Sequence, residues 1–193
     1  MLSFGSSVLP GSIILIGGTC LALLHFSDYS EASARQAIRF TSATSFILLI
    51  SAFVAAPLQR LIRKPFMKEI LQARRALGLS MAASHSMHLA MIGILVNIAW
   101  LGDWSPLGTP GELALSFSLY IVIFAMALTS NNYSQRLLGR GWRYLHLTGI
   151  YILMLAFSGA YLGAAIELGG HYWAFAAVAA MAFAVRFLGR RRA

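Results

Sequence analysis

Six long apolar runs, separated by short polar or basic breaks, constrain the fold of this chain more than any other feature. Each run has about the length that a helix needs to cross the hydrocarbon core of a bilayer, roughly 20 residues. Inside a bilayer the backbone must satisfy its own hydrogen bonds, and a helix does so within one segment. The pattern therefore predicts an all-α integral membrane protein, a bundle of six transmembrane helices, with spans near residues 8–26, 37–57, 76–101, 112–131, 142–166 and 171–189.

The composition leaves no room for a second, soluble domain. Of the 193 residues, 59% are hydrophobic and 11% are charged, and the mean hydropathy is +0.73. A soluble catalytic domain needs on the order of 100 residues of mixed polarity, and no stretch has that character. We expect residues 1–193 to form a single six-helix transmembrane domain, and any flavin or nicotinamide domain to belong to another polypeptide. The lone Cys20 excludes a disulfide within the chain and a cysteine-rich metal cluster.

The basic residues predict the orientation in the membrane. Thirteen of the 15 Lys and Arg residues fall in the break 60–75, in the break 132–143 and in the tail from Arg186, whereas the alternate breaks contain only Arg35 and Arg39. The positive-inside rule then places both termini in the cytoplasm. Anionic lipid headgroups account for the net charge of +9, so we expect membrane lipid, and not nucleic acid, as a partner.

The acidic residues and the prolines argue against a transporter. A proton-coupled transporter normally carries a carboxylate deep in the membrane, and all six Asp and Glu residues fall near the ends of predicted spans. Transporter sites are also built at helix interruptions. The prolines are all expected at helix ends or in loops, namely Pro10, Pro57, Pro65, Pro106 and Pro110.

The histidines are the candidate functional residues. An imidazole within a span is costly unless it faces the bundle interior and a partner. His85 and His88 are three residues apart and project from one side of the third predicted helix near mid-membrane, and His146 lies in the second turn of the fifth. His25 and His171 fall near span ends, where an interfacial role accounts for them. From the residues alone, helix–helix hydrogen bonding and metal ligation both remain open for the other three.

Three segments resemble one membrane protein family. They are Arg74-Arg75-Ala-Leu-Gly-Leu-Ser-Met-Ala-Ala-Ser-His-Ser-Met-His88, then Ala127-Leu-Thr-Ser130, then Gln135-Arg-Leu-Leu-Gly-Arg-Gly-Trp-Arg-Tyr-Leu-His146-Leu. Together they resemble the ferric reductase-like transmembrane domain family, and within it the haem-binding membrane subunits of bacterial methionine sulfoxide reductase systems. The resemblance covers about residues 40–165.

The resemblance implies a haem site with axial histidines on the third and fifth helices. Carried over residue by residue, it implies His88 and His146 as axial ligands of a haem b iron, with His85 as an alternative partner. The chain departs from the pattern at Gly159, where a second histidine of the fifth helix is expected. His88 and His146 also differ by about 12 Å in expected depth. One haem is therefore expected in preference to two, and a five-coordinate haem, or none, remains open.

Arginines gather at the expected cytoplasmic ends of the same two helices. Arg74, Arg75 and Arg143, with Arg140 beside them, would suit haem propionates, or a flavin phosphate from a partner. Lipid headgroups are the alternative. A flavin is expected only through a partner or by family likeness, because the chain contains no Gly-rich flavin fingerprint of its own.

Two functions follow as hypotheses. The first is a haem b-binding electron-transfer protein of the bacterial cytoplasmic (inner) membrane, carrying electrons from a cytoplasmic flavoprotein or quinol to an acceptor across the membrane. It would be a subunit of an oxidoreductase that could pair with a periplasmic oxidoreductase subunit, and it would contribute no catalytic residue of its own. The second is a haem-free membrane scaffold or assembly partner that retains the ferric reductase-like fold, and Gly159 is its main support.

Overall fold

In the computed structural model, which describes residues 4–26 and 28–191, the chain forms α-helices and one 3-10 helix. Six of the helices are long and apolar enough to cross a membrane. This confirms the prediction of an all-α, six-helix membrane protein. The elements are α1 (Phe4–His25), α2 (Glu31–Ile62), α3 (Pro65–Gln72), α4 (Arg74–Trp100), η1 (Ser105–Leu107), α5 (Pro110–Leu128), α6 (Asn132–Leu138), α7 (Arg140–Leu168) and α8 (Tyr172–Arg191).

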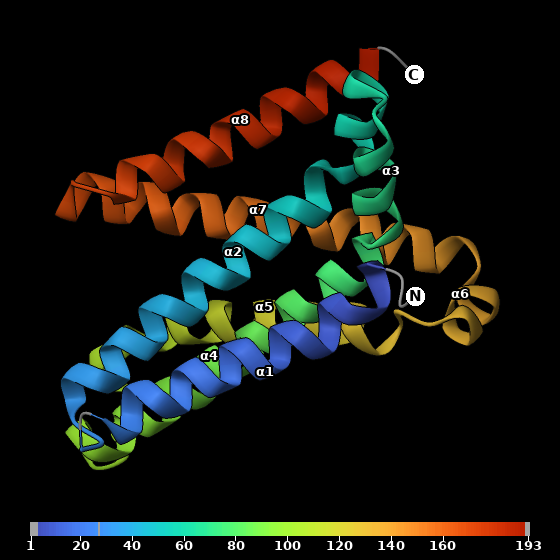
Figure 1. Cartoon of the computed structure of the whole chain (residues 1–193). Coiled ribbons are helices and arrows are strands. Elements are labelled where there is room, and N and C mark those ends of the chain that lie inside the picture. The colour runs from blue at the N-terminus through green and yellow to red at the C-terminus, as the bar shows by residue number, and fades with distance from the viewer. Residues whose placement is uncertain (1–3, 27, 192–193) are drawn as a thin grey trace.

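Two short helices, α3 and α6, replace what the sequence predicts as basic breaks. Helix α3 begins with Pro65, whose fixed φ suits the first turn of a helix and whose missing N–H is not needed there. Helix α6 is capped by Asn131, whose side chain accepts a hydrogen bond from the Ser134 N–H. Figure 1 shows both helices at the same end of the bundle, where α8 also ends.

Helix α2 lies at the centre of the bundle. It packs against α1 and α4 on one side and against α7 and α8 on the other (Figure 1). Its contacts with α4 include small polar residues: the Ser45 hydroxyl donates to Ser84 Oγ at 2.9 Å, and the Ser84 hydroxyl donates to the Thr41 carbonyl at 3.1 Å. Small side chains and interhelical hydrogen bonds are what hold helices together in lipid. Helix α5 is peripheral, since its main contacts within the described part of the chain are with α4 and α7.

Two prolines lie inside helices, which corrects the sequence prediction. Pro10 is within α1, and Pro57 is within α2, five residues before that helix ends. A proline removes the N–H that the carbonyl four residues earlier would accept. In α2 that carbonyl belongs to Phe53, and the Arg186 guanidinium of α8 donates to it at 2.6 Å. The carbonyl that Pro57 leaves without its usual backbone donor is therefore satisfied by a side chain from another helix.

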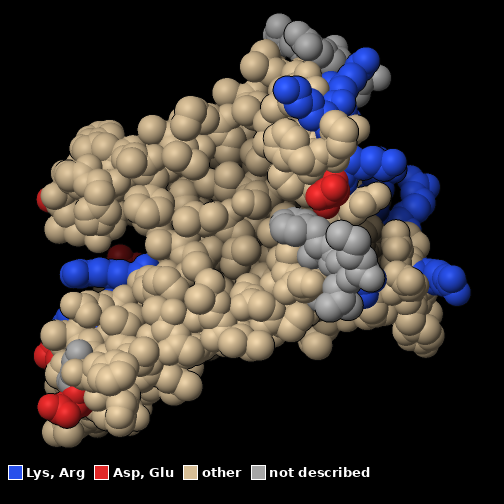
Figure 2. All heavy atoms as spheres, viewed as in Figure 1, with Lys and Arg blue, Asp and Glu red and all other residues tan. Residues whose placement is uncertain are grey.

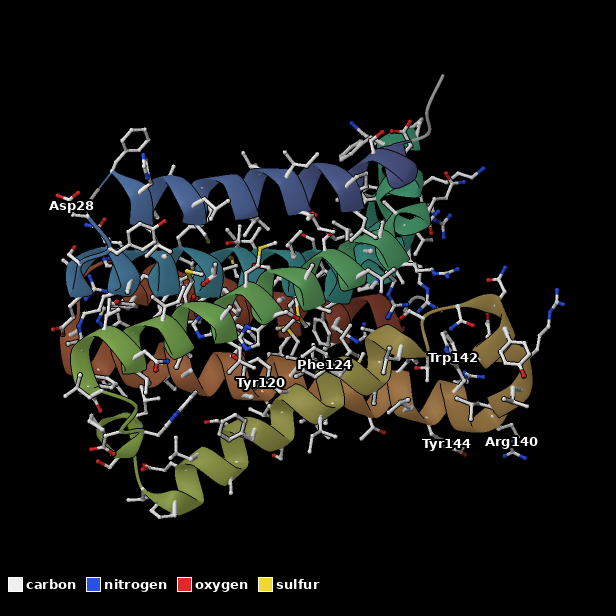
Figure 3. All side chains as sticks on the ribbon, turned by 90° about the horizontal axis from the view of Figure 1, so that it is seen from below. Asp28, Tyr120, Phe124, Arg140, Trp142 and Tyr144 are labelled. Carbon is white, nitrogen blue, oxygen red and sulfur yellow. The ribbon has the colours of Figure 1, made fainter. Side chains whose placement is uncertain are left out.

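The two ends of the bundle differ in charge. Figure 2 shows most lysines and arginines gathered at one end, which we call the basic end: the end of α2, residues 63–64, α3, α6, the beginnings of α4 and α7, and the end of α8. Asp28 marks the opposite end in Figure 3. The basic end contains every Lys and Arg that the topology argument counted toward the cytoplasm, within the described residues.

Candidate cofactor site

A cavity of about 820 Å³ opens at the basic end between α2, α4, α5, α7 and α8. His146 is the only imidazole among its described lining residues. Apolar side chains, six arginines and the neutral polar residues Gln72, Ser130, Asn131, Asn132 and Gln135 line it, while no Asp or Glu does within the described part of the chain. The apolar lining includes Leu49, Met81, Ile123, Met126, Ile150 and Leu153, and the arginines are Arg60, Arg74, Arg75, Arg143, Arg186 and Arg190.

His146 is held in place by the residue that follows α5. Its Nε2 lies 3.0 Å from the Thr129 hydroxyl, which itself donates to the Ala125 carbonyl at 2.6 Å. The hydroxyl oxygen is therefore free to accept, which assigns the imidazole proton to Nε2 and leaves the lone pair on Nδ1. Trp142 stacks on the imidazole, with ring centroids 4.2 Å apart, and donates from Nε1 to the Thr129 carbonyl at 2.9 Å. Thr129 thus orients both rings.

Figure 3 shows Trp142 at the inner side of the beginning of α7, with Arg140 and Tyr144 on its outer side. Tyr144 is 63% exposed, and Arg140 is exposed and does not line the cavity. His146 follows Trp142 by four residues, which is about one helical turn, so its side chain points inward as that of Trp142 does. Of the two aromatic residues at the start of α7, Trp142 therefore faces the cavity and Tyr144 faces the membrane interface.

Three predicted arginines, Arg74, Arg75 and Arg143, all line the cavity. Arg74 donates from Nε to the Ala52 carbonyl at 3.1 Å, and Arg75 donates from Nη1 to Asn132 Oδ1 at 3.2 Å. The sequence analysis missed the other three, Arg60, Arg186 and Arg190, because it treated them only as topology charges. No local pattern could have identified Arg186, since its partner Phe53 is 133 residues away.

His88 lies outside this cavity, at the interface of α2 and α4. Its Nδ1 is 3.0 Å from the Ile38 carbonyl and 3.1 Å from the Thr41 hydroxyl. Because a carbonyl only accepts, Nδ1 carries the proton and Nε2 carries the lone pair. A histidine anchored in this way resembles a metal ligand whose second nitrogen is fixed by the backbone. The backbone bond also accounts for His88 as an ordinary interhelical contact.

His85 also lies outside the cavity and is stacked among rings. Its ring centroid is 4.9 Å from that of His88, 4.9 Å from that of Tyr120 on α5, and 5.2 Å from that of Phe157 on α7. Figure 3 shows Tyr120 and Phe124 on the peripheral helix α5. The His85 Nδ1 is buried and has no hydrogen-bond partner among the described residues.

The structure does not bring the two histidine groups together. Phe157, which contacts His85, is 11 residues beyond His146 on α7, or about 16 Å along the helix axis. Two histidines that held one iron between them would need their nitrogens close together in space. His146 and the pair His85 and His88 are therefore placed at different levels of the bundle.

At the level of His85 the interior is filled by aromatic side chains. The Phe46 ring is 6.0 Å from that of Phe157 and 4.6 Å from that of Tyr161, and Tyr161 stacks on Phe175 at 4.6 Å. Gly159 does not face this cluster: it is exposed, and a Cβ added there would meet nothing within 4 Å. The interior position of α7 at this level is Phe157, not Gly159.

His25 and His171 lie where the sequence analysis expected interfacial residues. His25 is the last residue of α1, and His171 immediately precedes α8, both at the end opposite the basic end. The ring centroids of His171 and Tyr172 are 4.2 Å apart.

The cavity residues fit one haem with one histidine ligand. A haem requires an axial donor, apolar walls around the macrocycle and cations for its two carboxylates. His146, the apolar lining and the arginines supply these three components in one place. A second, opposing histidine is not found at this level among the described residues.

Comparisons with known proteins confirm the resemblance seen in the sequence. The chain is 33% identical over 122 residues to a protein of Enterobacter sp. (strain 638), covering 61% of this chain and 59% of that protein. It is 33% identical over 117 residues to one of Cronobacter sakazakii, covering 58% and 56%. It is 29% identical over 168 residues to one of Yersinia pseudotuberculosis serotype O:1b, covering 85% and 80%. All three are named "Protein-methionine-sulfoxide reductase heme-binding subunit MsrQ".

The matches to the first two relatives span less than two thirds of their length. No family model and no solved structure matches the chain. The relatives and the six apolar helices together indicate a multi-pass protein of the bacterial inner membrane.

Proposed function

We propose that this chain is a haem-binding electron-transfer subunit of a membrane oxidoreductase, and that a single haem b occupies the cavity at the basic end. The observation that carries the proposal is the lining of that cavity: one imidazole, apolar walls and six arginines, with no acidic side chain among the described residues. Such a site suits a flat, apolar ligand with an anionic edge. The names of the relatives, which are haem-binding subunits, support the same reading.

Each part of the cavity has a role in this proposal. His146 serves as the axial ligand, and Thr129 sets the orientation of its ring. The apolar lining would surround the flat face of the ligand, and the arginines of the cavity would provide positive charge for its carboxylates. When bound, the haem supplies a one-electron iron couple, which the axial ligand and the local polarity tune.

The proposal also orients the molecule. With the basic end in the cytoplasm, both ends of the chain are cytoplasmic and the cavity opens toward a cytoplasmic flavoprotein or a quinol in the inner leaflet. Electrons then pass to an acceptor across the membrane, supplied by a periplasmic oxidoreductase subunit. In this arrangement a flavin belongs to the donor.

The decisive experiment is a dithionite-reduced minus oxidised spectrum of the detergent-purified protein, with a pyridine haemochrome assay. We expect a b-type spectrum and about one haem per chain. A flavin spectrum without a haem band would overturn the proposal and assign the cavity to a flavin. A colourless protein after haem-supplemented expression would also overturn it.

One observation favours a second function, a haem-free scaffold or assembly partner. At the level of His85 and His88 the bundle is closed by packed aromatic rings, and His88 is engaged in a backbone hydrogen bond. The colourless outcome above would support this function. The scaffold also predicts that alanine at His146 leaves the purified protein's spectrum unchanged.

Thr129→Val tests how His146 is held. Valine matches the shape of threonine but removes the oxygen that accepts from His146 Nε2. Loss of such an orienting partner typically weakens metal binding 10- to 100-fold, so we expect haem to dissociate from Thr129→Val about tenfold faster. Haem transfer to apomyoglobin measures this rate.

Thr129→Ser is the matched control, because it keeps the hydroxyl, and its rate should equal that of the wild type. Equal rates for the valine variant and the wild type would show that Thr129 does not orient the ligand.

A further inference from the structure

Arg186 is held rigidly in the wall of the cavity by α2 and α7. Its Nη1 donates to the Phe53 carbonyl at 2.6 Å, and its Nε donates to the Tyr151 hydroxyl at 2.9 Å. Its guanidinium carbon lies 4.3 Å from the Phe53 ring centroid and 4.9 Å from that of Tyr151. The Phe53 carbonyl is available because Pro57 has no N–H to donate. A proline in one helix thus fixes the position of an arginine in another.

Arg74 is anchored beside it. Its Nε donates to the carbonyl of Ala52, the residue next to Phe53 on α2. The two guanidinium groups are therefore attached to adjacent carbonyls of one helix, and both line the cavity. Each guanidinium has five N–H donors, of which Arg74 spends one and Arg186 two on partners in the described part of the chain.

Among the described residues, no Asp or Glu of the cavity lining neutralises the charge of this pair. Both side chains are half-buried. Two like charges attached to adjacent carbonyls of one helix repel each other. An oxyanion that accepts the unspent N–H donors of both groups would relieve this repulsion.

We propose that Arg74 and Arg186 together form an oxyanion-binding site within the cavity, and that its occupants are the two carboxylates of the haem. This assignment rests on the proposed function and names the contacts that would orient the ligand. A lipid phosphate offers the same chemistry, and the experiment below distinguishes the two sources.

The test compares haem with haem dimethyl ester, in which both carboxylates are masked. Affinities are measured by absorbance titration of apoprotein for the wild type, Arg186→Gln, Arg74→Gln and the control Arg136→Gln. Arg136 lies on α6 at the same end but does not line the cavity. Hydrogen bonds to charged groups predict about a tenfold or greater preference of the wild type for haem over the ester. The affinity of each cavity variant for haem should fall about tenfold and its affinity for the ester should change little. Both affinities of Arg136→Gln should match those of the wild type.

Two further comparisons separate folding from recognition. The comparison of haem with its ester uses the unchanged wild-type protein, and Arg74→Gln leaves the contacts between α8 and α2 intact. The carboxylate assignment can therefore be tested even if Arg186→Gln misfolds. Arg186→Lys, which keeps the charge but loses the planar fork, should recover only part of the preference for haem.

Each outcome leads to a definite conclusion. Equal binding of haem and ester by the wild type would overturn the carboxylate assignment while leaving the haem site standing. If added phosphatidylglycerol then competes in the wild type but not in Arg186→Gln, the two arginines bind a lipid phosphate instead. A preference for haem that persists in both glutamine variants would overturn the role of this pair. Binding of neither ligand by the wild type would overturn the proposed function and this inference together.

Discussion

Replacing His146 with alanine is expected to abolish haem binding. His146 is the only imidazole among the described residues that line the cavity, so its loss leaves no nitrogen ligand of the usual kind for the iron. The variant, expressed with supplementary haem, should contain close to no haem by the pyridine haemochrome assay. Its purification profile and thermal stability should stay near those of the wild type, because His146 is only partly buried.

His88→Ala is the informative companion. His88 lies at another depth and is tied to the Ile38 carbonyl, so this variant should retain about one haem per chain. The two-histidine site that the family resemblance implies predicts that both variants lose haem. Retention by His146→Ala with loss by His88→Ala would instead place the iron at His88 Nε2 and contradict the cavity as the site.

Gly189→Ala is expected to displace α8 from α2 and to destabilise the protein. An added Cβ at Gly189 would lie 2.5 Å from the Pro57 Cβ and 2.9 Å from its Cα. A proline within a helix has no flexible end that could move aside, so the helices themselves must separate. Overpacking of this kind costs about 1–3 kcal/mol, and the separation would also draw Arg186 away from the Phe53 carbonyl. Thermal unfolding in detergent measures the loss as a lower midpoint.

Gly159→Ala is the matched control, since it makes the same change within a long helix. No atom lies within 4 Å of its added Cβ, so the better helix propensity of alanine should raise stability by about 0.5–1 kcal/mol. The stability of Gly149→Ala should fall between those of the other two variants, because the closest neighbour of its added Cβ is the sulfur of Met126, which can move. An unchanged midpoint for Gly189→Ala would show that α8 is not pressed against Pro57.

The fold was largely predictable because each membrane-spanning helix is determined by its own segment of sequence. The length and polarity of each apolar run decide whether it spans a bilayer, and all six spans were found, with ends displaced by a few residues. The largest displacement is in α2, which begins before and continues beyond the predicted 37–57. The carbonyl freed at Pro57 is bonded by Arg186, and no pattern in the sequence links Phe53 to a residue 133 positions away.

The site was predictable only in part. Helical rise alone showed that His88 and His146 differ in depth, and the structure keeps them apart. It also groups Arg74, Arg75 and Arg143 around one cavity with His146. Which side of a helix a residue faces is set by packing against other segments. For this reason the sequence could not show that Gly159 faces outward while Phe157 faces His85.

The lining of the cavity has a consequence for the biogenesis of the protein. Its described residues run from Leu49 on α2 to Arg190 on α8 and come from five membrane helices, from the short helices α3 and α6, and from the segment before α6. A ribosome inserting this chain delivers His146 before Arg186, and the wall is complete only when the final helix has packed against Pro57. For the proposed haem site, loading of the cofactor is therefore expected to follow the packing of α8 and to occur through the mouth at the basic end.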